Sequence, residues 1–162
     1  MATIKTASLN VQISVSETLD SAPATAGSVL NNQFDAGQRS LSPTTTPAVS
    51  KYAGWQPALV AGTLDIDLTS LPGTQGSFSG LTKEVVAFRL KNPASNSGTI
   101  TIQPGTSNGY DILGSVGKAV IPPGGELYCY KAAGGQTVDA THKVVNLAGT
   151  GTEACDLELI LG

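Results

Sequence analysis

The sequence has few charged side chains, and they show no basic excess. Charged residues make up 13% of the 162 residues, whereas a typical soluble domain has about 25%. Nine Lys and Arg residues stand against twelve Asp and Glu residues, which gives a formal net charge of −3. Such a chain lacks the basic surface that drives phosphate contacts and counterion release, so we expect no nucleic-acid partner.

Residue types that carry out catalysis or bind metals are also scarce. The only histidine is His142. One histidine cannot form a histidine pair around a metal, and a Ser-His-Asp triad would depend on this single residue. We therefore expect no enzyme, no metal and no cofactor. His142 stands at the start of a strand pattern, where a solvent-facing or turn-capping role is ordinary.

Long apolar runs are missing as well. No stretch approaches the roughly 20 apolar residues that a membrane helix needs, so we expect no membrane partner. Residues 1–15 alternate polar and apolar positions instead of forming the continuous apolar segment of a secretory signal. Two cysteines do not make a disulfide framework, so we expect synthesis in a reducing host cytoplasm with both cysteines as thiols.

The sequence does contain enough aliphatic residues for a hydrophobic core, and in its regular segments they recur with a period of two. Leu, Ile, Val and Phe together number 39. Alternation of apolar and polar residues indicates a strand with one buried face, and denser apolar runs indicate strands covered on both faces. Alternation predicts strands over residues 9–15, 64–68, 99–103 and 154–161, dense runs predict them over 84–90 and 143–147, and turn signals bound two more at 119–121 and 126–131.

The breaks at residues 90–98 and 104–109 suit successive antiparallel connections. Residues 90–98 and 104–109 are polar clusters rich in Asn, Ser, Gly and Pro, and residues 122–125 read Pro-Pro-Gly-Gly. Strand signals recur at the spacing expected of a sandwich or barrel. We predict an all-β antiparallel sandwich, jelly-roll-like, of about eight to ten strands. Its core spans residues 58–162, preceded by residues 1–57 with an N-terminal strand and a long irregular region.

The irregular region has two interpretations. Residues 19–57 are polar, with little periodicity, and are interrupted by Val29, Leu30 and Phe34. They could form loops packed on their own domain, which we favour, or an extended arm that orders against a neighbouring subunit. The sequence alone leaves both open.

Other chemically suggestive residues have simpler explanations. Asp65 and Asp67 share one strand face, which could begin a calcium site or an acid pair, but their alternation with apolar residues marks the solvent face. Cys129 and Cys155 share the inward side of their strands with leucines, which favours buried thiols. The glycine clusters at 114–117 and 149–151 lack the lysine and following helix of a phosphate loop and are interpreted as turns.

Four aromatic residues are the interface candidates. Tyr128 and Tyr130 are expected on the strand face opposite Leu127, where their rings could pack on another sheet or contact a partner. Tyrosine is common at interfaces because it buries apolar area and keeps a hydroxyl for hydrogen bonding. Trp55 and Tyr52 form a second pair of candidates. A lone tryptophan is more often a core anchor.

Four segments resemble small β-sandwich virion structural proteins of tailed bacteriophages: residues 88–93, 99–105, 121–127 and 154–161. The likeness covers residues 82–162 and consists of strands separated by Asn/Ser-rich and Pro-Gly turns. It implies a non-enzymatic capsid decoration, cement or minor capsid protein located in the virion. It further implies a homo-oligomer, with a trimer favoured, that contacts the major capsid protein or other virion proteins, and it offers no catalytic residues.

A carbohydrate-binding or adhesin-like module of a tail fibre or tail tip is the alternative. In that case Trp55, Tyr128 and Tyr130 would stack on sugar rings, and a glycan would be the partner. The shortage of charge is compatible with repeated assembly contacts, because 33 Ser and Thr residues supply polar groups that can be desolvated without burying unpaired ions.

Overall fold

A computed structural model describes residues 6–9, 12–18, 29–35, 39–73, 76–114, 117–131 and 135–162 of the chain. The described residues form strands and turns, and none of them belongs to a helix that could cross a membrane. The strands are β1 (Ala7–Leu9), β2 (Gln12–Thr18), β3 (Val29–Asp35), β4 (Arg39–Leu41), β5 (Lys51–Trp55), β6 (Thr63–Asp67), β7 (Val85–Lys91), β8 (Ile100–Pro104), β9 (Ala119–Ile121), β10 (Glu126–Tyr130), β11 (Val144–Ala148) and β12 (Asp156–Leu161).

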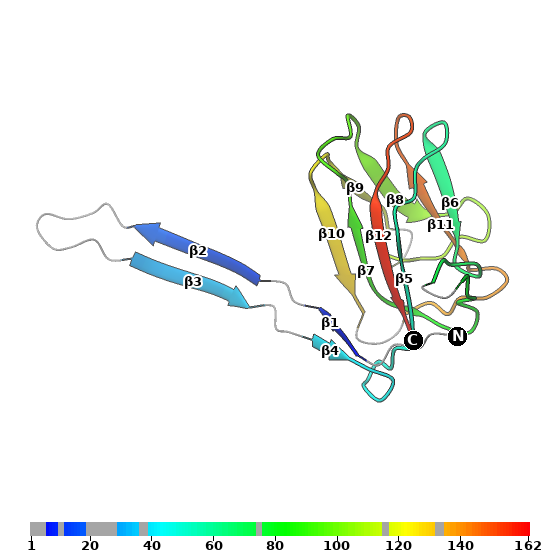
Figure 1. Ribbon diagram of the computed structural model, residues 1–162, viewed down its shortest axis with the longest axis horizontal. Coiled ribbons are helices and arrows are strands. Elements are labelled where there is room, and N and C mark those ends of the chain that lie inside the picture. Colours follow the sequence, from blue (N-terminus) through cyan, green and yellow to red (C-terminus); the bar gives the residue numbers. More distant parts are fainter. Residues whose placement is uncertain are drawn as a thin grey trace, which may run out of the picture.

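Eight of these strands form two four-stranded sheets that face each other (Figure 1). Sheet I has the order β10-β7-β12-β5, and sheet II has the order β6-β11-β8-β9. Every neighbouring pair within them is antiparallel. The predicted all-β antiparallel sandwich is therefore confirmed.

The strand partners are nested along the chain. β5 pairs with β12, β6 with β11, β7 with β10 and β8 with β9. Consecutive strands consequently alternate between the sheets, except for β8 and β9. The prediction that residues 90–98 join neighbouring antiparallel strands is wrong, because β7 and β8 lie in different sheets. Turn residues reverse the chain direction, but they do not determine which sheet receives the next strand.

The core lies between the inner faces of the two sheets. In β12 every second residue is buried, so residues that face the core alternate with residues on the outer face. The fully buried side chains include Leu68, Leu90, Ile100, Ile102, Tyr110, Leu147, Leu157, Leu159 and Leu161. β7 is buried on both faces over its first four residues, as its dense apolar run predicts. β11 is buried on one face only, so that expectation is wrong for residues 143–147.

The region expected to be irregular contains further strands. β1 pairs with β4 and β2 with β3, and in Figure 1 these two ribbons follow one another away from the sandwich. β5, at residues 51–55, is a full member of sheet I although the predicted core begins at residue 58. Its sequence gives a weak strand signal because Ala53 and Gly54 interrupt the large residues. Residues 19–28 and 36–38, on which part of the arm prediction rests, lie outside the described residues.

A small second cluster fixes residues 41–50, the last residue of β4 and the segment that joins it to β5, against sheet I. Leu41 and Val49 are buried there beside Val86, with Tyr130 and Ile160 packed around them. The backbone N–H of Ser50 donates to the carbonyl oxygen of Leu161 at 2.8 Å. We call residues 41–50 the ribbon base, because they connect the N-terminal ribbons to the sandwich.

Tyr110 provides a buried polar contact at the end of sheet I where β7 begins. Its hydroxyl accepts from the Val85 N–H at 2.9 Å and donates to the Gln136 carbonyl oxygen at 2.6 Å. Burial raises the pKa of Tyr110 to about 12. The hydroxyl therefore stays protonated and ties two segments together.

Removal of this hydroxyl should destabilise the fold. Tyr110→Phe leaves the Val85 N–H and the Gln136 carbonyl without this partner, which costs about 1–3 kcal/mol. Urea denaturation measures the loss, with Tyr52→Phe as the matched control at an exposed ring. Equal stability of the two variants would contradict the structural role of the buried hydroxyl.

Candidate functional site

The outer face of sheet I gathers charged and aromatic residues into adjacent rows. The strand register places Tyr128, Arg89, Glu158 and Gly54 side by side on β10, β7, β12 and β5. The next row toward one end of the sheet holds Glu126, Lys91 and Asp156 on the first three of these strands. Because alternate residues of a strand share a face, both rows point away from the core.

Arg89 lies at the centre of this face. Its Nε and Nη2 each lie 3.2 Å from an oxygen of Glu126, and its Nη1 lies 3.5 Å from Glu158 Oε1. Its guanidinium also lies 5.8 Å from the centroid of the Tyr128 ring, within the range of a cation–π contact. Lys91 Nζ approaches Glu126 Oε1 at 3.5 Å. Both cations are thus already paired within the face.

Hydrogen bonds set the protonation of this group. Tyr128 donates its hydroxyl proton to Glu126 Oε2 at 2.6 Å. The hydrogen bonds from Arg89 and Tyr128 lower the pKa of Glu126 to about 2. The same carboxylate raises the pKa of Tyr128. At neutral pH the site therefore holds a carboxylate, a guanidinium and a protonated phenol.

Two tyrosine rings stand exposed on this face. Tyr52 is 42% exposed and Tyr128 is 43% exposed, far more than a core aromatic. The Tyr52 ring lies along β5 over Gly54, since a Cβ at Gly54 would overlap the ring. Tyr128 likewise reaches along β10 to Glu126. β5 and β10 run antiparallel, so both rings lean toward the same end of the sheet.

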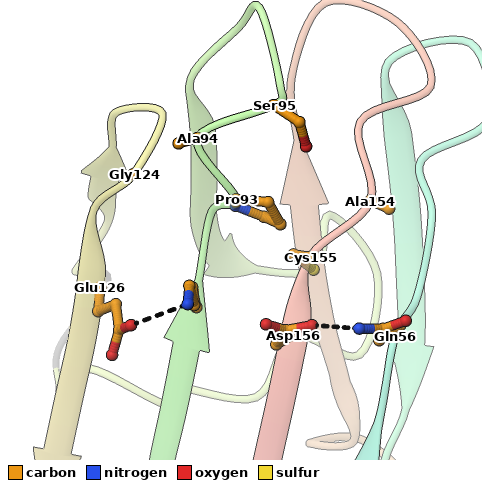
Figure 2. A pocket seen from close by; sticks show the side chains of 10 residues that line it. Gln56, Pro93, Ala94, Ser95, Gly124, Glu126, Ala154, Cys155 and Asp156 are labelled. Carbon is orange, nitrogen blue, oxygen red and sulfur yellow. Dashed lines mark hydrogen bonds and ion pairs between the residues drawn. The ribbon is translucent and has the colours of Figure 1, made fainter.

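At that end the face opens into a polar groove with a volume of about 590 Å³. Figure 2 shows Glu126 and Asp156 at its base and the loops bearing Ser95 and Gly124 at its rim. Gln56 donates from Nε2 to Asp156 Oδ1 at 2.7 Å. The groove continues the row of charged side chains, so face and groove form one surface, which we call the sheet I site.

The structure separates the four predicted interface residues. Tyr52 and Tyr128 belong to the sheet I site. Tyr130 lies on the same face of the sheet but packs beside the ribbon base in the second cluster. Trp55 faces inward and packs against the main core, the ordinary role of a lone tryptophan.

Sequence reasoning missed Arg89, Glu126 and Glu158. The available signal was the alternation of charged with apolar residues in β7 and β12, where Arg89 follows Phe88 and Glu158 follows Leu157. Without knowledge of which strands pair, that alternation marks only a solvent face.

His142 belongs to a turn, as expected. Asp139 Oδ1 accepts the backbone N–H groups of Thr141 and His142, each at 2.7 Å. His142 Nδ1 lies 3.1 Å from Asp139 Oδ2, and this contact contributes most to lowering the pKa of Asp139. The arrangement is a turn-capping one.

The paired acids of β6 also have structural partners. Asp65 accepts from Asn146 Nδ2 at 2.8 Å, and Asp67 accepts from the Thr69 N–H at 2.8 Å and from Lys143 Nζ at 3.2 Å. Both lie on the outer face of sheet II, since the residue between them, Ile66, is buried. Within the described ranges no group of three His, Cys, Asp or Glu residues is placed to hold a metal.

Both cysteines pack against the core, with Cys155 buried as the sequence predicts and Cys129 only partly buried. Cys155 is 1% exposed, and burial raises the pKa of its thiol to about 12. Cys129 packs partly buried beside Leu127, and burial raises its pKa as well. Neither thiol has the depressed pKa of a reactive cysteine.

Comparison with models of known protein families, with curated proteins and with solved structures finds no match.

The thiols should resist alkylation in the folded protein. Iodoacetamide reacts with thiolates, and burial keeps both thiols protonated and shielded. We expect slow labelling of Cys129 and slower labelling of Cys155 in buffer, with rapid labelling of both in urea. Intact-protein mass spectrometry measures the extent of labelling over time. Rapid labelling of Cys155 in buffer would contradict its buried position.

The carboxylate of Glu126 should make the free energy of unfolding depend on pH. Its pKa in the folded chain, about 2, lies below the ordinary value of 4.5. Its contribution to stability is therefore present above the ordinary pKa and is lost as the pH falls toward 2. In urea denaturation between these pH values, the wild type should lose more stability than Glu126→Gln. Parallel losses in the two proteins would refute this assignment.

Proposed function

We propose that the protein is a non-enzymatic virion structural protein, a capsid decoration, cement or minor capsid component that acts through contacts between copies of itself and with other virion proteins. The observation that carries the proposal is the nested pairing of β5 to β12. We interpret this pairing as a jelly roll, an architecture used by viral capsid domains. The analogy is one of fold.

The N-terminal ribbon supports assembly through an arm. In the pairing of β2 with β3, Ile13 stands opposite Phe34, Val15 opposite Asn32 and Glu17 opposite Leu30. These alternate positions share one face of the ribbon, which therefore carries most of its apolar residues. A two-stranded ribbon is at best marginally stable alone in water, so packing of this face on a neighbouring subunit would stabilise it.

The outer face of sheet II also supports the proposal, because its polar groups suit repeated contacts between subunits. Gln103 donates to Asn146 at 3.1 Å, and Asn146 donates to Thr63 Oγ1 at 3.0 Å. Asp65 ends this ladder on β6, where it accepts from Asn146 at 2.8 Å, and on the other edge strand of the sheet Val120 is 58% exposed. Neutral polar groups that already satisfy one another can be covered by a partner with less desolvation cost than unpaired ions.

Self-assembly should depend on the apolar face of the ribbon. We expect light scattering coupled to size exclusion to give three times the 16.4 kDa mass of the chain. Ile13→Asp should shift the protein toward the monomer by placing a charge on the packed face. The matched control Ser14→Asp, on the opposite face of the same strand, should leave the trimer intact.

A wild-type monomer over the micromolar range, or equal effects of the two variants, would overturn assembly through the ribbon. The virion assignment has its own test. Mass spectrometry of purified tailed-phage particles that carry this gene should detect the chain at a copy number that is a multiple of three. Its absence from the particles would overturn the assignment whatever the oligomeric state.

A further inference from the structure

We propose that the sheet I site binds a neutral, extended oligosaccharide, with the exposed rings of Tyr52 and Tyr128 contacting sugar faces and the Arg89–Glu158 group and the groove hydrogen-bonding the hydroxyls. This binding would be additional to assembly and does not rest on it.

The first argument is the exposure of aromatic rings where the fold does not need them. Each ring is over 40% exposed, and neither belongs to a buried cluster of the described residues. Tyrosine presents a flat apolar face with a polar end, the combination that matches the alternating C–H and O–H groups of a sugar ring. Gly54 keeps the surface beside Tyr52 low enough for the ring to lie along the strand.

The second argument is hydrogen-bonding capacity that remains open between the rings. Arg89 uses two of its five N–H donors in hydrogen bonds to Glu126, and its Nη1 forms an ion pair with Glu158. Among the described contacts, Oε2 of Glu158 and Oδ2 of Asp156 accept no hydrogen bond. Fixed acceptors beside a fixed donor are suited to sugar hydroxyls, which both donate and accept.

The third argument concerns charge and selects a neutral ligand. Arg89 and Lys91 are both paired with Glu126, so an anionic ligand would have to compete with a carboxylate that is already in place. A cationic ligand would find Glu126 occupied by Arg89 and Tyr128. The open carboxylates of Glu158 and Asp156 each have a cation beside them, Arg89 and Lys91 respectively, which would repel it. An uncharged polyhydroxyl compound can use the remaining groups and leave these pairs intact.

The fourth argument is size. Tyr128 and Tyr52 lie on the two edge strands of sheet I, three strand spacings apart and offset by two residues along the strands, a separation of about 16 Å that an oligosaccharide of several units can span. The groove lies at the end toward which both rings lean. An extended chain of sugars can cross the sheet and place a branch or end in the groove. The ribbon base packs at the other end of the sheet, beside Tyr130, and leaves this region uncovered.

The test is titration of the isotope-labelled full-length chain with cellohexaose and, separately, chitohexaose, followed by amide NMR spectra. At oligosaccharide concentrations up to about 10 mM the titration detects millimolar dissociation constants. We expect at least one of the two to give saturable shifts confined to residues 52–56, 89–95, 124–128 and 154–158. Tyr52→Ala and Tyr128→Ala should each weaken binding by about tenfold, through loss of a ring contact.

Matched variants separate ring stacking from general effects. Tyr52→Phe keeps the ring and should keep the affinity, whereas Gly54→Ala displaces the Tyr52 ring and should weaken binding as Tyr52→Ala does. Leu81→Ala, at an exposed residue outside the sheet I site and outside the surfaces proposed for assembly, should leave oligosaccharide binding unchanged. Light scattering on the same samples reports assembly independently, so loss of the trimer without loss of binding affects only the proposed function.

Three results would overturn the proposal. They are the absence of shifts with both oligosaccharides in a folded protein, shifts that lie outside the sheet I site, and binding that the tyrosine variants leave unchanged. A sulfated hexasaccharide that binds where both neutral compounds fail would likewise reject a neutral ligand.

Discussion

Burial of one face of each sandwich strand against the opposite sheet is the constraint on which the rest of the structure depends. Because side chains alternate along a strand, a residue committed to the core fixes its neighbours on the outside. Phe88, Leu90, Leu157 and Leu159 occupy the core, and this commits Arg89 and Glu158 to the outer surface. The nested pairing then aligns β10, β7, β12 and β5, so that residues more than 100 positions apart meet in one row, as Gly54 and Glu158 do. The sheet I site is therefore a consequence of the core.

Much of the sandwich could be predicted from local pattern. Alternation and turn residues locate β6 to β12, with each end within about two residues, as is common for strand boundaries. β5 was not predicted because Ala53 and Gly54 weaken its alternating pattern. Its place in sheet I depends on pairing with β12, over 100 residues later in the chain. Sheet membership is decided by such long-range partners. For the same reason residues 90–98 could be identified as a turn but not as a crossing between sheets.

The candidate site was less accessible to sequence reasoning. The strand face opposite Leu127 pointed to Tyr128, and residue type alone pointed to Tyr52 in a chain with 5% aromatics. It also pointed to Trp55, whose inward position in β5 packs it, partly buried, against the core. Arg89 has no unusual sequence context, and its importance arises only when Glu126 and Glu158 flank it from two other strands. Arg89 is held between these two carboxylates, and the Tyr128 hydroxyl is fixed to Glu126 as well.

The ribbon base gives the sandwich two unlike ends. Leu41 and Val49 pack at the end of sheet I near the last strand residue, Leu161, while the loops around the groove form the other end. A subunit held to its neighbours through the ribbon would have a fixed orientation, with the groove directed away from the attachment. In a symmetric assembly every copy would then display the same surface in the same direction. Weak single contacts at that surface would add to a strong collective one, as they do for any array of identical sites on a common support.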